Sequence, residues 1–398
     1  MNHYDTVIVG AGPAGASAAR VLAEGGARVL LVEKAKLPRY KPCGGGLTAR
    51  ARAVAPHVTL FAPEARADRA VLAYGAQRVE CALPEPVTMV MRDRFDHFLV
   101  GQAAASGAEV RDETRLRNME RVGVGLRLLV GKETIAARYV VGADGANGLT
   151  ARLASFAPPR HIGAALEVEL AVSERARACY ERSALFDFAA VHSGYGWIFG
   201  KGDHLSVGVG YFLSRRPHEK RDLRAALARF LAAHPDLRDG KTLLQQGHRV
   251  PLAGARKTAR RGPVLLADDA AALADPITGE GISYALASGS RAGTAILAAL
   301  HSDGDGDVRA LDDYDRYLRR ELWRDLPYAR LVGTLAYHYP AQLLGLVARH
   351  PHARDSLAGA VGGASSYRDL TATVLCRAPC LLRRVPYIYH ATSAGGPE

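Results

Sequence analysis

The chain has 398 residues, of which 48% are hydrophobic and 23% are charged, values that are ordinary for a globular protein of two or three domains. It has no uncharged apolar run of eighteen residues, so no transmembrane helix is expected. It has no secretory signal at its start, so we expect a cytoplasmic location. The formal net charge is +12, yet no basic motif interleaved with aromatic residues occurs, so nucleic acid is not an expected partner. An anionic membrane surface or an anionic substrate stays open as a reason for the charge.

The first predicted unit is a strand, a helix and a second strand near the N-terminus. Residues 6–9 are a short, mostly β-branched run, which favours a buried strand, and a Gly-x-Gly-x-x-Gly motif follows at once. Residues 14–23 are strong helix formers, and the glycine pair at 25–26 ends that helix. Residues 29–32 predict the second buried strand, which ends at an acidic residue.

Each glycine of this motif matches a need of dinucleotide binding. Gly10 permits the tight turn, Gly12 lets the backbone approach a pyrophosphate, and Gly15 allows the helix to pack closely on the strand. The N-terminus of the helix then faces the anion. Glu33, 18 residues after Gly15, can accept hydrogen bonds from an adenosine ribose and would repel a 2′-phosphate. The unit therefore predicts FAD or NAD rather than NADP.

The next segments alternate between loop and sheet patterns. Residues 37–50, LPRYKPCGGGLTAR, are too rich in glycine and proline for a helix or a central strand and predict a loop. Strand patterns follow at 57–90, at 134–141 and, with the alternation of an antiparallel sheet, at 161–250. A strand, an acidic turn and a long alanine-rich helix that opens near Gly279 to Gly281 come next, and the pattern is helical from about residue 305 onward.

Four motifs together resemble the geranylgeranyl reductase family: GAGPAGASAA, KPCGGGLTARA, GADGANG and DDAAALADPITGEGI. A fifth segment, GYGWIFGKGDHLSVGVG, resembles the aromatic YxWxFP motif of that family, and the likeness spans most of residues 1–295. The family consists of FAD-dependent prenyl reductases with the para-hydroxybenzoate hydroxylase type of fold. The resemblance implies FAD as cofactor, a polyprenyl or lipid substrate whose isolated C=C bonds receive hydride from flavin N5, and an external electron donor, either NADPH or of the ferredoxin type.

The expected fold class is α/β of mixed α+β character. It combines an FAD-binding Rossmann-type domain, an inserted antiparallel β-sheet substrate domain and a helical C-terminal region. The expected boundaries are 1–56, 91–160 and 251–304 for the discontinuous FAD-binding domain, 57–90 and 161–250 for the substrate domain, and 305–398 for the helical region.

The resemblance also assigns roles to single residues. It implies that Glu33 binds the adenosine ribose, that Arg92 contacts FAD, and that Asp269 binds the ribityl or pyrophosphate part. Gly281 and Ile282 would present backbone N–H groups to the pyrimidine edge of the flavin, where they would stabilise the negative charge of its reduced form. The other expected cofactor-binding residues are Gly10, Gly12, Ala14, Gly15, Lys34, Gly44, Gly45 and Gly279.

The loop from Pro42 to Gly46 is expected to pass beside the isoalloxazine ring and to place Cys43 at the reaction centre. Its thiol would supply a proton, tune the flavin or shape the pocket, and the alternative is a buried small hydrophobe without a catalytic role. Tyr195, Trp197 and Phe199 alternate along one strand and so face the same side. They either line an apolar tunnel for a polyprenyl chain or are ordinary aromatic residues of a sheet core.

The chain departs from the family in three ways. Asp268 stands where the family has the first glycine of GDAAG, and it adds a carboxylate near a phosphate of FAD. Gly200 stands where the aromatic motif has proline, which is expected to free the backbone beside the substrate cavity. The Gly-Val-Gly stretches at 123–125 and 208–210 lack a following helix, so both predict plain sheet and no second nucleotide site.

Two rival functions stay open: a flavin-dependent monooxygenase of an aromatic or lipid substrate, and a non-catalytic FAD-binding redox sensor. A halogenase is less favoured because its WxWxIP-type motif is absent. Residues 316–326 alternate basic with apolar side chains, which favours either a peripheral membrane contact or a helix packed on the protein body. Five scattered cysteines predict no disulfide framework, and the isolated Cys376-x-x-x-Cys380 pair predicts no metal site.

Overall fold

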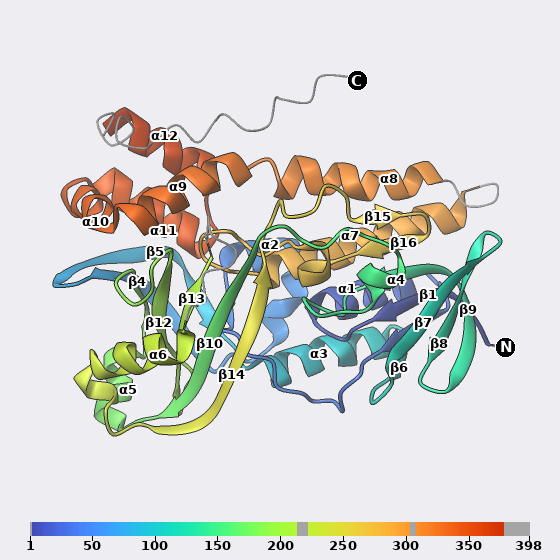
Figure 1. Ribbon diagram of the computed structural model, residues 1–398, viewed down its shortest axis with the longest axis horizontal. Helices are drawn as coiled ribbons and strands as arrows, with labels where there is room; N and C mark the ends of the chain where they lie inside the picture. The colour runs from blue at the N-terminus through green and yellow to red at the C-terminus, as the bar shows by residue number, and fades with distance from the viewer. Residues whose placement is uncertain (1, 213–221, 303–307, 378–398) are drawn as a thin grey trace.

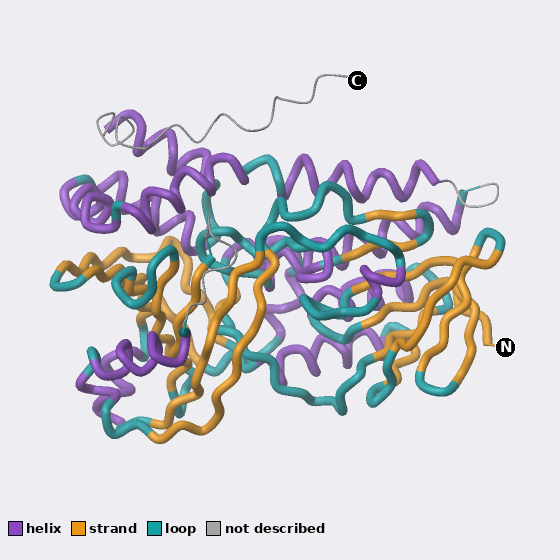
Figure 2. The backbone as a smooth tube through the Cα atoms, in the orientation of Figure 1, coloured by secondary structure: helices purple, strands orange, loops and turns teal. Residues whose placement is uncertain are grey.

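The computed structural model describes residues 2–212, 222–302 and 308–377, and within them two eight-stranded sheets lie side by side with helices along one flank (Figures 1 and 2). The strands of the first sheet are β1 Asn2–Val9, β2 Val29–Val32, β6 Glu109–Arg111, β7 Leu116–Val122, β8 Gly125–Val130, β9 Glu133–Gly142, β15 Arg260–Arg261 and β16 Val264–Leu266. Those of the second are β3 Gly46–Leu47, β4 Ala65–Tyr74, β5 Gln77–Met89, β10 Ile162–Ala171, β11 Ser183–Asp187, β12 Gly194–Gly200, β13 Leu205–Tyr211 and β14 Lys241–Pro251.

Twelve α-helices fall within the same described ranges. They are α1 Pro13–Glu24, α2 Ala49–Val54, α3 Arg92–Ala105, α4 Thr150–Leu153, α5 Glu174–Tyr180, α6 Leu223–Ala232, α7 Ile282–His301, α8 Val308–Tyr317, α9 Leu326–His338, α10 Pro340–Arg349, α11 Pro351–Gly362 and α12 Tyr367–Arg377. Short helical turns lie at Pro56–Leu60, Pro235–Leu237, Asp268–Ala271 and Leu318–Leu322. The helical pattern expected after residue 305 is confirmed over the described residues.

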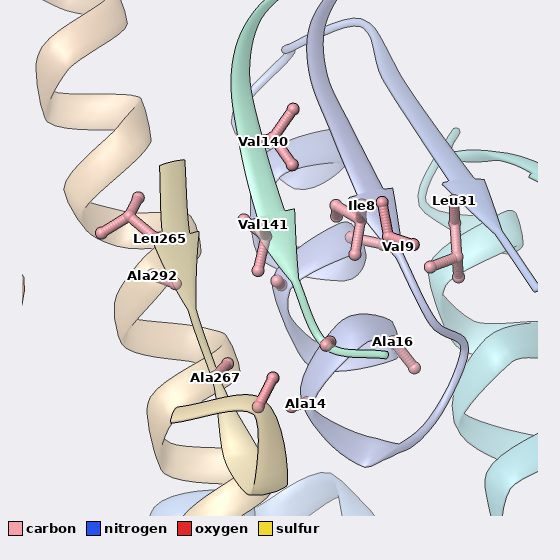
Figure 3. Close-up of a cluster of buried hydrophobic side chains, with 14 of the residues drawn as sticks. Ile8, Val9, Ala14, Ala16, Leu31, Val140, Val141, Leu265, Ala267 and Ala292 are labelled. Carbon is pink, nitrogen blue, oxygen red and sulfur yellow. The ribbon is translucent and has the colours of Figure 1, made fainter. Parts of the chain in front are cut away.

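The first sheet is built on parallel strands in the order β16-β9-β1-β2-β6, and β8 joins it antiparallel along the edge of β9. Strands buried on both faces need continuous apolar runs, which is why 6–9, 29–32 and 139–141 read as such runs. Their side chains pack against small residues of the neighbouring helices (Figure 3). The labelled members are Ile8, Val9, Ala14, Ala16, Leu31, Val140, Val141, Leu265, Ala267 and Ala292.

Helix α1 packs against the parallel strands and also contacts α3 and α7. The α1–α7 contact is close because it is made by small residues: a Cβ added to Gly289 of α7 would lie 2.1 Å from the carbonyl oxygen of Ala14. The predicted helix and both predicted strands of this unit are confirmed, with α1 beginning one residue earlier than expected.

The second sheet has the order β14-β10-β13-β12-β11-β4-β5-β3, and its two faces pack against different helices. The outer face forms a core with α5 and α6, whereas β4, β5 and β12 pack on their inner face against α9 to α12. The expectation of a purely antiparallel sheet is wrong at one place, because β4 and β11 pair in parallel. These two strands come from separate insertions, so no hairpin forces them to run in opposite directions.

Several smaller expectations meet the structure here. Gly208 to Gly210 lie in β13 as expected, but Gly123 to Gly125 form the β7–β8 turn, where Gly123 has a φ of +58°. Along 316–326 the apolar Leu318 is fully buried, and Leu322 and Trp323 pack on the first core, so these side chains face the protein body. None of the helices within the described ranges combines the length and the hydropathy needed to cross a bilayer. Cys380 and the side chain of Cys376 lie outside the described residues.

Candidate functional site

A groove opens at the end of β1, where the glycine motif turns into α1. Gly10 has a φ of +104°, and a Cβ on it would lie 2.3 Å from the carbonyl oxygen of Ala143. A Cβ on Gly15 would lie 1.8 Å from the carbonyl oxygen of Gly10, so neither position accepts a side chain. No side chain caps the N-terminus of α1, which leaves its first turn facing the groove. The residues fit a dinucleotide because bare backbone and a helix N-terminus are what a pyrophosphate needs.

Glu33 lies at the end of β2 and is only 4% exposed. Its carboxylate accepts hydrogen bonds from the backbone N–H groups of Ala11 at 2.9 Å and Ala35 at 3.1 Å. The side chain therefore fixes the glycine turn as well as lining the groove, and Lys34 beside it is an exposed residue of the rim. The backbone of Ala14 packs closely against Gly289 of α7, and Ala14 is not among the residues that line the groove.

Arg39 is a groove residue that the sequence reasoning missed. Its guanidinium lies 3.6 Å from where a Cβ of Gly12 would stand, and it pairs with Glu33 at 3.4 Å and with Asp96 at 3.0 Å. This cation therefore lies over the turn that a pyrophosphate approaches. No local pattern in the sequence singles out Arg39 among the 52 lysines and arginines of the chain.

Arg92 begins α3 and is buried against Asp96, with two hydrogen bonds of 2.8 and 3.0 Å. Burial opposes its charge, but the Asp96 carboxylate outweighs burial and raises the pKa of Arg92. The side chain lines the inner cavity described below, so a fixed positive charge stands at that wall.

The acidic turn after β16 carries Asp268 and Asp269, both buried. Asp269 is held by the Nζ atom of Lys41 at 3.2 Å and by Nε2 of His248 at 3.0 Å. Burial opposes the charge of Asp269, but Lys41 and His248 outweigh it and lower the pKa of this carboxyl. Burial and then the charge of Asp269 raise the pKa of Asp268 to about 7.

The backbone explains the glycines that the family has in this turn. Asp268 has a φ of +56° and Ala272 a φ of +57°, and these are the first and last positions of the GDAAG pattern. Left-handed backbone favours glycine, so both replacements carry strain. We predicted that Asp268 adds a carboxylate charge beside a phosphate of FAD. The raised pKa corrects this prediction in part, because it leaves Asp268 substantially protonated near neutral pH.

The inner cavity has a volume of about 180 Å³ and lies between the Pro42–Gly46 loop, the Thr278–Ile282 turn and the second sheet. Cys43 is half-buried in its wall, and its Sγ accepts a hydrogen bond from the N–H of Gly45 at 3.4 Å. Gly44 lies against the ring of Phe199, where a Cβ would come within 2.7 Å. The groove and the cavity share the residues Lys41, Pro42, Gln246, His248 and Asp268. The groove and the cavity therefore adjoin each other at these five residues.

Gly279, Gly281 and Ile282 line the cavity opposite the Cys43 loop. Asp275 organises their turn by accepting N–H bonds from Ile277 and Thr278, both at 2.8 Å. Gly281 is the N-cap of α7, and the Glu280 carboxylate accepts a hydrogen bond from the N–H of Ser283 in the first turn at 2.7 Å. Gly281 and Ile282 at this helix N-terminus line the cavity.

Tyr195, Trp197 and Phe199 are buried on the inner face of β12 and line the cavity. The Tyr195 ring stacks on Phe212 at 5.1 Å and meets Phe186 edge-on at 5.4 Å. Gly200, by contrast, is not among the cavity-lining residues: its missing Cβ would face the backbone of Tyr180 and Glu181 on the outer side. The prediction that glycine in place of proline at position 200 frees the backbone beside the cavity is therefore wrong.

The C-terminal helices contribute a wall that the sequence did not reveal. A small apolar extension of the cavity begins at Phe186 and Tyr195 and continues between the second sheet and α9 to α12. Its further lining residues are Leu72, Phe188, Ile277, Thr278, Val332, Ala336, Leu343, Leu357, Val361 and Tyr367. The end of the cavity that carries Cys43 thus adjoins an end lined mainly by apolar side chains.

Comparison with known proteins places these features in context. Residues 3–325 match the FAD binding domain family. The chain is 32% identical over 360 residues to digeranylgeranylglycerophospholipid reductase 1 of Methanopyrus kandleri, covering 83% of this chain and 90% of that protein. It is also 32% identical over 339 residues to an uncharacterized protein of Methanosarcina barkeri, covering 85% of this chain and 84% of that protein.

Solved structures share the fold at lower identity. A geranylgeranyl bacteriochlorophyll reductase-like protein from Thermoplasma acidophilum superposes with a TM-score of 0.78 at 22% identity, covering 96% of this chain and 98% of the other. The flavin-dependent brominase Bmp2 has a TM-score of 0.76 at 18% identity, covering 96% of this chain and 100% of the other. The fold is therefore common to reductases and halogenases and does not by itself decide between their reactions.

Proposed function

Because the chain belongs to the geranylgeranyl reductase family of FAD-dependent enzymes, we propose that it saturates isolated C=C bonds of a polyprenyl group carried by a lipid. Relatives that are 32% and 29% identical to this chain are named digeranylgeranylglycerophospholipid reductases. These names favour a lipid over a free prenyl diphosphate as the substrate. The observation that carries the proposal is the inner cavity, which has Cys43 in its wall and shares lining residues with the dinucleotide groove on one side and with an apolar pocket on the other.

FAD in its reduced form supplies the hydride for such a reaction. The chain's own residues would do the rest. Glu33, Arg39 and the first turn of α1 would hold the adenosine and pyrophosphate parts, and the N-terminus of α7 would face the flavin. Cys43 would lie at the reacting bond, as a proton donor or as a group that tunes the site.

The apolar end would bind the chain of the substrate. Phe186, Tyr195 and the facing residues of α9 and α11 offer hydrocarbon and ring surface and exclude water from an alkene that has no polar group to bind. Aromatic faces would also favour positive charge that develops at the tertiary carbon. A small aromatic substrate of a halogenase or monooxygenase would be too short to fill this hydrophobic extension.

The electron donor and the cellular location are also proposals. The chain has one dinucleotide motif, so NADPH or a ferredoxin-type protein would reduce FAD from outside that groove. We propose a cytoplasmic protein that meets its lipid at the inner face of the membrane.

Mass spectrometry tests the function directly. The FAD-loaded protein, reduced chemically without oxygen, is mixed with a lipid that bears geranylgeranyl chains and with the fully saturated lipid as control. We expect a mass gain of two hydrogens for each saturated bond and reoxidation of the flavin in step with it. Reoxidation only when oxygen and an aromatic substrate are added would instead identify a monooxygenase, and stable FAD binding without any turnover would favour a redox sensor.

A further inference from the structure

Two glutamates are buried beside the cavity, although the function described so far does not use them. Glu167 and Glu169 alternate along β10 with Leu166, Val168 and Leu170, which pack in the outer core. Each glutamate is 3% exposed and faces the inner side of the sheet. Two carboxylates this close would repel each other strongly in a buried site, so the arrangement needs a compensating proton or cation.

The hydrogen bonds of Tyr40 indicate a proton. Its hydroxyl oxygen lies 3.0 Å from Oε1 of Glu167 and 3.1 Å from Oε1 of Glu169. A tyrosine hydroxyl has one hydrogen and can donate it to one carboxylate only. The second contact is a hydrogen bond only if that carboxyl carries a proton and donates it to the Tyr40 oxygen. The pair therefore shares one proton through Tyr40.

The electrostatic surroundings agree with this count. Burial and then the charge of Glu169 raise the pKa of Glu167 to about 8. Burial opposes the charge of Glu169, but His204 and Lys201 outweigh it and lower the pKa of Glu169. Lys201 is itself buried and donates its hydrogen bond to the carbonyl of Val90, so it balances charge at a distance without taking either carboxylate as a partner.

From Glu169 the chain of contacts continues to the surface. Oε2 of Glu169 and Nε2 of His204 form an ion pair at 3.2 Å without hydrogen-bond geometry, whereas Nδ1 of His204 is hydrogen-bonded to Oδ1 of Asp203 at 2.6 Å. The side chain of Asp203 is 91% exposed. Burial opposes the charge of His204, but Glu169 and Asp203 outweigh it and raise the pKa of His204.

In the other direction Glu167 reaches the reaction centre. Its side chain lines the same cavity as Cys43. On the neighbouring strand β14, Gln246 is paired with Glu167, and His248 faces the cavity in its bond to Asp269. From Asp203 to Glu167, the nearest side-chain nitrogen or oxygen atoms of successive residues in this series are 3.2 Å apart or less.

We propose that Asp203, His204, Glu169, Tyr40 and Glu167 form a proton relay that carries protons from solvent to the cavity beside Cys43. The inference rests on the proposed function. Saturation of one C=C bond takes a hydride from reduced FAD at one carbon and a proton at the other, so two electrons and two hydrogens enter the bond. Glu167 gives up its proton toward that second carbon, directly or through the Cys43 thiol, and regains one from Glu169 and His204.

Three isosteric or near-isosteric variants test the relay. Tyr40→Phe removes the bridging hydroxyl, Glu167→Gln removes the shared proton site, and Tyr180→Phe is the matched control, since Tyr180 is buried on the outer side of the same sheet. In single-turnover oxidation of the reduced holoprotein by the lipid, we expect Tyr40→Phe and Glu167→Gln to be slower by about 10²-fold, the lower range for loss of an acid–base group. The control should keep the rate of the wild type and its pH profile.

Infrared spectroscopy gives a readout that needs no turnover. The wild type should show a protonated-carboxyl C=O band that disappears as the pH rises through about 8. Asp268 contributes a similar band near pH 7, so the spectrum of Glu167→Gln is subtracted to isolate that of Glu167. No Glu167 band at pH 6, or an unchanged rate and pH profile in Tyr40→Phe, would overturn the relay. A wild type that never reduces a prenyl lipid overturns the proposed function instead, while the infrared band still decides whether the pair holds a proton.

Discussion

The dinucleotide groove and the inner cavity adjoin each other, yet they are built in different ways. The floor of the groove depends on the segment from Gly10 to Arg39, where a turn, a helix N-terminus and one acid act together within a short stretch, and residues 114–116, 143–149 and 246–248 complete its walls. The cavity takes its walls from a loop, two insertions, the start of α7 and the C-terminal helices. The turn that would meet the pyrophosphate is thus set by a local segment, whereas the environment of the reaction is assembled from distant parts of the chain.

The two regions meet at Lys41, His248 and the acidic turn. Asp269 holds the side chains of Lys41 and His248 there, and Asp268 lines the groove and the cavity alike. A change confined to the Cys43 thiol in the cavity should therefore alter the reaction more than FAD binding, a change at Glu33 in the groove should do the reverse, and a change at Asp268 acts where the two regions meet.

The largest effect is expected for Cys43→Ala in the cavity. If the thiol donates the proton or sets the reactivity of the site, the variant should keep FAD yet reduce the alkene about 10²- to 10⁴-fold more slowly in a single turnover. Cys43→Ser distinguishes the two roles, because a hydroxyl can relay a proton but lacks the soft contact of sulfur. An alanine variant with the rate of the wild type would leave Cys43 as a small residue that fills space beside Gly45.

A smaller effect, confined to the groove, is expected for Glu33→Arg. The change removes the carboxylate that would bind the ribose and that accepts the Ala11 N–H bond. FAD binding should weaken by about 1.5–3 kcal/mol, or roughly 10- to 150-fold. Fluorescence titration of the FAD-free protein measures it, with Glu120→Arg on the exposed β7 hairpin as control. At saturating FAD the single-turnover rate should return; a persistent loss of rate would show that groove and cavity are not separable.

The smallest effect belongs to the junction. Asp268→Gly relieves left-handed backbone at φ +56° and should stabilise the FAD-free protein by about 1 kcal/mol, which raises Tm by about 2 °C. The native pKa of Asp268 is raised to about 7 from 3.8, so its own contribution to stability is complete below 3.8 and is lost as the pH rises through about 7. The gain in Tm should therefore be larger at pH 8 than at pH 5, and an equal gain at both values would leave only the backbone effect.

The sequence alone determined the parts of the protein that depend on short-range physics. A parallel strand buried on both faces needs an apolar run, and a backbone that touches a pyrophosphate needs glycine, so β1, α1, β2 and the groove were predicted closely. The single side chains that could not be found are those without a local pattern. Arg39 is one of many basic residues, and only the fold brings it over Gly12.

Tertiary structure decided what the second sheet does. In β10 the run Leu-Glu-Val-Glu-Leu has the alternation of a strand with one wet face, and the glutamates would be expected in water. The FAD-binding half and the Cys43 loop cover that face instead, so Glu167 and Glu169 are buried and share a proton. Likewise, helices α9 to α12 close the apolar end of the cavity. Alternation along a strand separates two faces, but only the packing of distant segments decides which face meets solvent and which becomes the wall of a site.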